Sequence, residues 1–182
     1  MTDWSPETSP VVHPEGRHKE LVRDSQHYAQ LAGIPVGALW IPLSEICSAN
    51  EVAWVKSFPK HEAKGIRGLI YTGPSSQVLA HSQALAGALV RNFIDARLRT
   101  IEDCLEEPVH PTVLVIPDLF WGIENPTPTR RQKMASLLMD HFQQGHRLVC
   151  YVSDFDQFAE AYGPATADLL KDSCLMLNLG AL

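Results

Sequence analysis

The chain has 182 residues, of which 45% are hydrophobic and 20% charged, and its formal net charge is −6 at pH 7. This length suits about one domain whose core buries about 70% of the surface of the unfolded chain, which excludes fibrous chains, coiled-coil rods and disulfide miniproteins. Proteins that bind the phosphate backbone of DNA or RNA usually carry a basic surface. The negative net charge therefore argues against direct nucleic-acid binding as the main function.

The N-terminal part is polar. Residues 1–16 combine acids and prolines without an apolar period, which predicts a flexible N-terminal arm, and residues 17–182 are expected to form one α/β domain. Residues 17–31 predict a polar helix that ends at Gly33-Ile34-Pro35, and residues 49–58 predict a second helix that ends at Pro59. The chain start carries no basic, apolar leader, and the four cysteines are widely spaced without a C-x-x-C pair, so we expect a reduced, cytoplasmic protein.

The rest of the chain alternates between apolar strands and amphipathic helices. The predicted strands are 69–72, 98–100, 113–116, 148–152 and 174–179. The predicted helices are 77–96, 101–107, one that starts within 126–128 and stops at Gly145, 155–162 and 165–171. Short apolar strands separated by helices indicate an α/β fold with a parallel sheet of about five strands, covered by helices on both faces.

The turn after the first of these strands has the layout of a phosphate-binding loop. Such loops need glycines that let backbone N–H groups wrap the phosphates, a lysine that neutralises them and a hydroxyl that ligates magnesium. In the segment that starts at Gly73-Pro74, the later glycine positions hold Ser76 and Val78, the lysine position holds Leu79 and the hydroxyl position holds Ala80. The sequence therefore argues against an ordinary nucleoside triphosphate site. A strand-to-helix turn without any ligand is the alternative.

From about Ala32 to Gly180 the order and spacing of the segments resemble the DnaC/IstB-type helicase-loader ATPases of the AAA+ class. The segments that carry this resemblance are Gly33-Ile34-Pro35, Gly68 to Pro74, Thr112 to Leu119, the strand that enters Ser153-Asp154, Tyr162 to Leu170, and Cys174 to Gly180. The resemblance implies a P-loop, AAA+-like fold, here without a separate lid domain, and a role in DNA replication or transposition.

Departures from the family pattern remove its ATP chemistry. Pro117 replaces an acid that would hold magnesium, Asp118 keeps the neighbouring acid, Asp154 stands in place of a polarising asparagine, and Asp168 stands in place of the arginine finger. Phosphoryl transfer depends on positioning and on neutralisation of charge, and neither is provided for here. We therefore expect no catalytic residue, no cofactor and no metal site. The expected remnant of the nucleotide pocket comprises Gly73, Pro74, Ser76, Val78, Leu79, Ala80, Pro117, Asp118, Asp154 and Asp168.

These observations favour a pseudoenzyme that acts by binding another protein. The resemblance implies that the partner is a replicative helicase, a helicase loader or a related AAA+ ATPase, for example with this chain as a phage- or mobile-element-encoded modulator of replication. The candidate partner-binding residues are Phe120, Trp121, Arg130 and Arg131. Two alternatives remain open. One is a diverged nucleotide-binding ATPase or other enzyme that uses the same cleft. The other is a single-strand DNA-binding loader centred on Arg97, Arg99, Arg130 and Arg131.

Other polar residues have structural interpretations. The acids around Glu102 predict a solvated helix face, and Asp154 with Asp156 predicts a helix cap. We expect His81 and His141 at the surface or at the edge of the core.

Overall fold

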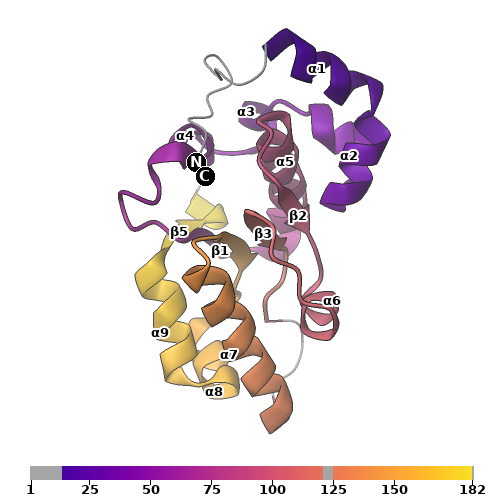
Figure 1. The fold of residues 1–182 in the computed structure, drawn as a ribbon. Helices are drawn as coiled ribbons and strands as arrows, with labels where there is room; N and C mark the ends of the chain where they lie inside the picture. Colours follow the sequence, from indigo (N-terminus) through magenta and orange to yellow (C-terminus); the bar gives the residue numbers. More distant parts are fainter. Residues whose placement is uncertain (1–13, 121–124, 182) are drawn as a thin grey trace.

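A five-stranded, all-parallel sheet lies at the centre of the chain (Figure 1). The coordinates come from a computed structural model and describe residues 14–120 and 125–181. The strands are β1 Gly68–Thr72, β2 Ala96–Leu98, β3 Val113–Ile116, β4 Arg147–Tyr151 and β5 Cys174–Asn178. Their order across the sheet is β2-β3-β4-β1-β5. The predicted α/β fold with a parallel sheet of about five strands is confirmed.

Helices cover both faces of the sheet (Figure 1). The helices are α1 Pro14–Arg23, α2 Ser25–Ala32, α3 Leu43–Ile46, α4 Ala49–Lys56, α5 Val78–Arg91, α6 Ile101–Glu106, α7 Pro128–Gln143, α8 Phe155–Tyr162 and α9 Pro164–Ser173. Short 3₁₀ turns are η1 Val36–Trp40, η2 Phe58–Lys60, η3 Ser75–Gln77 and η4 Leu179–Ala181. Within residues 14–120 and 125–181, no helix combines the length and the apolar character that a membrane span requires.

Alternate side chains of each strand enter two separate hydrophobic cores. Leu69 and Tyr71 of β1 pack with α2, α4 and α5 on one face, whereas Ile70 packs with α6, α7, α8 and α9 on the other. In β4, Val149 and Cys150 divide between the same two cores. Because both faces are buried, the interior strands read as continuous apolar runs in the sequence.

Three predicted elements were wrong in their bounds. The helix predicted over 77–96 ends at Arg91, because Phe93 takes a left-handed conformation with φ 56°, which stops the helix and starts the turn into β2. Strand β2 then occupies Ala96–Leu98 instead of 98–100. The helix predicted over 17–31 is two helices separated at Asp24. Residues 1–13 of the predicted arm lie outside the described residues, and α1 begins at Pro14.

The topology creates a crevice at one edge of the sheet. The chain leaves β1 into α5 on one face, and it leaves the neighbouring strand β4 into α8 on the opposite face. In open α/β sheets, ligands bind outside the carboxyl ends of the strands at such a switch point. A ligand site in this fold is therefore expected between the turn after β1 and the carboxyl ends of β2, β3 and β4.

Candidate functional site

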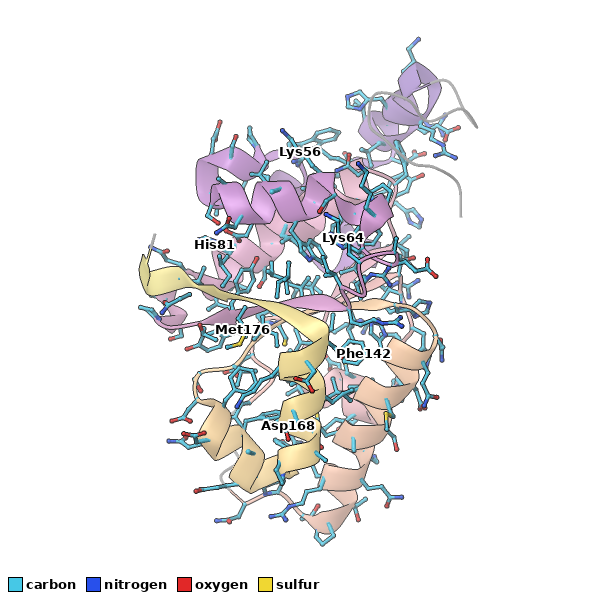
Figure 2. The ribbon with its side chains drawn as sticks, turned by 90° about the vertical axis from the view of Figure 1, so that its left-hand side faces the viewer. Lys56, Lys64, His81, Phe142, Asp168 and Met176 are labelled. Carbon is cyan, nitrogen blue, oxygen red and sulfur yellow. The ribbon has the colours of Figure 1, made fainter. Side chains whose placement is uncertain are left out.

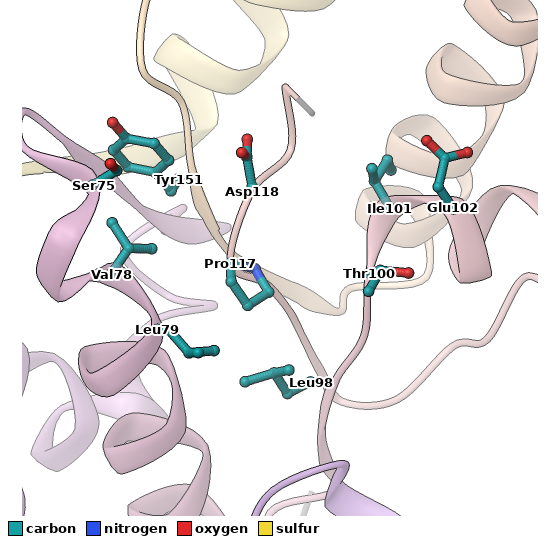
Figure 3. A pocket seen from close by; sticks show the side chains of 10 residues that line it. All are labelled: Ser75, Val78, Leu79, Leu98, Thr100, Ile101, Glu102, Pro117, Asp118 and Tyr151. Carbon is teal, nitrogen blue, oxygen red and sulfur yellow. The ribbon is translucent and has the colours of Figure 1, made fainter. Parts of the chain in front are cut away.

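A cavity of about 550 Å³ lies at the carboxyl ends of the strands (Figure 3). Val78 and Leu79 at the start of α5 form one wall, and Leu98 and Thr100 at the end of β2 form the opposite one. Pro117 and Asp118 follow β3, and Tyr151 ends β4. This size is in the range of sites for small ligands, so the crevice that the topology predicts exists as a real concavity.

The Gly73 turn is held in place by contacts within the protein. Gly73 has φ 88°, and a Cβ atom at this position would lie 2.4 Å from Oδ1 of Asn178. The same Asn178 oxygen accepts a hydrogen bond of 2.8 Å from the Gly180 amide, and the Tyr151 hydroxyl donates a bond of 2.8 Å to the Gly73 carbonyl. Glycine is therefore required here by the close approach of β5, whether or not a phosphate ever binds.

Beyond Gly73-Pro74 the chain tightens into a helix. Residues Ser75–Gln77 form the 3₁₀ turn η3, and Val78, the first residue of α5, is buried. Leu79 takes the lysine position of a phosphate loop and points into the cavity with 53% of its surface exposed. Ser76 and Ala80 are exposed and do not line the cavity.

Acidic groups are the charged groups in the lining. Asp118 accepts a 3.0 Å hydrogen bond from the Phe120 amide, and burial raises its pKa against the lowering effect of that bond. Glu102, the other acid in the lining, is bound by Arg130. Among the described residues that line the cavity there is no Lys, Arg or His. A triphosphate in this position would meet negative charge and aliphatic carbon.

The remaining predicted pocket residues lie apart from the cavity. Asp154 accepts bonds of 2.8 and 3.1 Å from the amides of Asp156 and Gln157, which confirms the predicted cap of α8. Asp168 is exposed on α9 (Figure 2). The structure thus gathers Val78, Leu79, Pro117 and Asp118 around the cavity. Neither Asp154 nor Asp168 joins them.

The candidate partner-binding residues have different surroundings. Trp121 lies outside the described residues. Phe120 is half-buried and packs edge-on against Phe158 and Tyr162. Arg130 is held by Glu102 and by the Tyr162 hydroxyl at 3.0 Å, and its side chain is only 15% exposed. Arg131 is exposed on α7.

A second polar cluster is buried between α4, β1 and α5. Oε1 of Glu51 accepts 2.8 Å bonds from the Tyr71 hydroxyl and from Nδ1 of His81, and Oε2 accepts bonds from the Ser48 amide at 2.7 Å and hydroxyl at 2.9 Å. Burial raises the pKa of Glu51, but the hydrogen bonds from His81, Ser48 and Tyr71 outweigh it and hold the pKa below its ordinary value. Glu51 is fully buried, so it needs these donors.

The same cluster has the composition of a metal site. The ligand atoms of Cys47, Glu51 and His81 lie within 4.8 Å of one another. Both carboxylate oxygens of Glu51 already accept two hydrogen bonds, and burial with the neighbouring Glu51 raises the pKa of the Cys47 thiol. A carboxylate whose oxygens already accept four hydrogen bonds and a thiol that keeps its proton are poor metal ligands. We therefore interpret the cluster as a structural hydrogen-bond network.

Sequence reasoning missed this network and misplaced two histidines. His81 is 3% exposed and His141 is 1% exposed, so the expectation of a surface or core-edge position was wrong for both. Each histidine has a hydrogen bond that permits burial. His81 Nδ1 bonds Glu51, and His141 Nε2 bonds the Arg147 carbonyl, each at 2.8 Å. The Ser48-x-x-Glu51 capping pattern is the one sequence signal that could have located the network.

No protein-family model matches the sequence, and no curated protein matches it significantly. What the fold and the site define is an open α/β protein with a largely apolar crevice at its topological switch point.

Proposed function

We propose that this chain is a non-catalytic, AAA+-like pseudo-ATPase of the cytoplasm that acts by binding another protein. The partner we propose is a replicative helicase, a helicase loader or a related AAA+ ATPase in DNA replication or transposition. The choice of partner rests on the sequence resemblance. The parallel five-stranded sheet, with the Gly73 turn on an interior strand and α5 directly after it, supports the same choice.

The observation that carries the proposal is the lining of the switch-point cavity. Leu79 stands where a lysine would neutralise phosphate, and Asp118 adds a carboxylate nearby. Phosphoryl transfer is almost entirely positioning and electrostatic stabilisation, and the described lining of this cleft offers no cation that would stabilise the transferred phosphate. A fold of this kind that cannot process a nucleotide acts through its surface.

Two alternatives receive less support from the geometry. A diverged nucleotide-binding enzyme would need a cation in the crevice, and none stands in its described lining. A single-strand DNA-binding loader would use a cluster of free arginines, but Arg97 is paired with Asp95 and Arg130 with Glu102. The net charge of −6 on the protein also repels the phosphates of a nucleic acid.

Nucleotide binding is the direct test. We expect no change of melting temperature and no heat of binding with millimolar ATP and magnesium. Leu79→Lys should introduce weak triphosphate binding, because it places a cation in the cavity, whereas Leu31→Lys should not, because Leu31 is equally exposed but lies on α2. Magnesium-dependent binding of ATP by the natural chain would refute the proposal.

Partner identity is tested separately. The tagged chain is used to capture proteins from its native host, and each captured protein is then purified and its binding to the chain is measured directly. We expect a helicase, a loader or another AAA+ ATPase that binds with and without nucleotide. Capture of single-stranded DNA in place of a protein, with strong dependence on salt, would favour the loader alternative.

A further inference from the structure

The switch-point cavity carries an apolar wall that residues 14–120 and 125–181 leave uncovered. Leu79 is 53% exposed, and Figure 3 shows its side chain directed towards Leu98 across the cavity, with Pro117 beside them. Ile101 and Val78, both buried, continue the apolar surface inward. Apolar surface gathered in a concavity marks a site for an apolar group, because its burial removes that surface from water.

Among the described residues that line the cavity, Asp118 is an acid without an ion-pair partner. Asp118 accepts a single bond, from the Phe120 amide to Oδ1, and no described Lys, Arg or His lies within ion-pair distance of it. The other acid in the lining, Glu102, is already neutralised by two bonds of 2.7 Å from Arg130. A half-buried carboxylate without a cation is electrostatically complementary to a positive group on whatever enters the cavity.

We propose that the cavity binds an aliphatic side chain of a partner protein together with an adjacent Lys or Arg of the same segment. The aliphatic group lies between Leu79 and Leu98, and the cation binds the carboxylate of Asp118. The choice of a protein segment as occupant rests on the proposed function. The requirement for an apolar group next to a cation rests on the cavity alone.

Blocked peptides provide the probe. The peptide Ala-Leu-Leu-Arg-Ala and the same peptide with Glu in place of Arg are titrated to millimolar concentration against the ¹⁵N-labelled chain. We expect the Arg peptide to shift the amide resonances of Leu79, Leu98 and Asp118 and to bind about tenfold more tightly than the Glu peptide. Failure of both peptides to bind, or equal affinity for both, overturns the inference.

Matched variants separate the two contacts. Asp118→Asn should remove most of the preference for Arg, whereas Asp172→Asn, an exposed acid at the end of α9 on the opposite edge of the sheet, should preserve it. Leu79→Ala should weaken both peptides, whereas Leu31→Ala, at 52% exposure on α2, should weaken neither. Each pair makes the same chemical change inside and outside the cavity. A preference that survives Asp118→Asn refutes the assigned cation contact.

Two further measurements identify the class of occupant and show whether this inference alone or also the proposed function fails. Octylamine that binds more than about tenfold tighter than the Arg peptide would assign the cavity to small cationic amphiphiles and refute a protein segment. If neither peptide binds and ATP does not bind either, this inference fails while the proposed function stands. If the natural chain binds ATP with magnesium, the proposed function itself fails.

Discussion

The guanidinium of Arg130 and the carboxylate of Glu102 form two parallel hydrogen bonds, each 2.7 Å long. This pair joins the start of α7 to α6, and the Tyr162 hydroxyl extends it to α8. The sequence predicts that Arg130 binds a partner. In the structure its guanidinium connects three helices of the protein itself. The contribution of Arg130 to the free energy of unfolding can therefore be measured separately from any contribution to partner binding.

A double-mutant cycle with Arg130→Met and Glu102→Gln should give a coupling energy of about 1 kcal/mol, because the pair is bidentate but Glu102 remains partly solvated. The hydrogen bond from Arg130 lowers the pKa of Glu102, so the coupling is present above the ordinary Glu pKa of about 4.3 and is lost as the pH falls through the lower folded value. Urea unfolding at pH 7 and pH 3 measures it. Arg131→Met, on the same helix but exposed, is the control. A coupling of zero at pH 7 would make the pair irrelevant to stability.

Gly73→Ala should destabilise the protein by about 2 kcal/mol, because the new Cβ atom would clash with Asn178 and the backbone is left-handed. Gly37→Ala is the matched control, since an added Cβ at Gly37 meets no atom within 4 Å and its φ is not positive. The free energy of unfolding of each variant checks this. Equal stability of the two variants would show that Gly73 has no structural role.

The sequence contains most of the information about the sheet and little about the site. Interior strands such as those predicted at 113–116 and 148–152 are buried on both faces. Their continuous apolar runs can therefore be recognised in the sequence without knowing which strands lie beside them. Strand β2 is only three residues long and was misplaced, since the left-handed Phe93 that sets its start has no signature in the sequence. Local pattern predicts an element best where burial is complete.

The candidate site depended on spacing along the chain, and spacing does not report position in space. Leu79 and Asp118 are 39 residues apart in number yet line one cavity, whereas Asp154, which the family pattern places in the pocket, caps a helix. The buried pair of Glu51 and His81 had no motif that joins its members, because the bond crosses from α4 to α5. Such pairs become visible only when the helices are packed.

Glu51→Gln should destabilise the protein by about 2–4 kcal/mol, because an amide nitrogen would replace an oxygen that faces hydrogen-bond donors in a buried site. The folded-state pKa of Glu51 is lowered, so the stability it contributes is present above pH about 4.3 and lost as the pH falls through the folded value. Glu45→Gln, an exposed acid on α3, is the control and should change stability by less than about 0.5 kcal/mol. Chemical denaturation of the natural chain and of both variants at pH 7 and pH 3 tests the difference.

Two buried histidines should give the protein a loss of stability in mild acid. Burial lowers the pKa of His61 and of His141 to about 4 each, below the ordinary value near 6.5. Between these values the unfolded chain binds more protons than the folded chain. Stability is therefore full above pH about 6.5 and falls as the pH drops towards 4, by up to about 1.4 kcal/mol per pH unit for each histidine.

His61→Phe isolates one of these contributions. The phenyl ring keeps a flat apolar group between Trp54 and Phe58, whose ring centroids lie 4.7 and 5.3 Å from that of His61, but it cannot bind a proton. The slope of unfolding free energy against pH between 4.5 and 6 should therefore decrease by about one proton equivalent. His27→Phe, at an exposed position on α2, should leave the slope unchanged. Parallel slopes for the natural chain and His61→Phe would mean that His61 is protonated in the folded state, despite its burial and the nearby charge of Arg147.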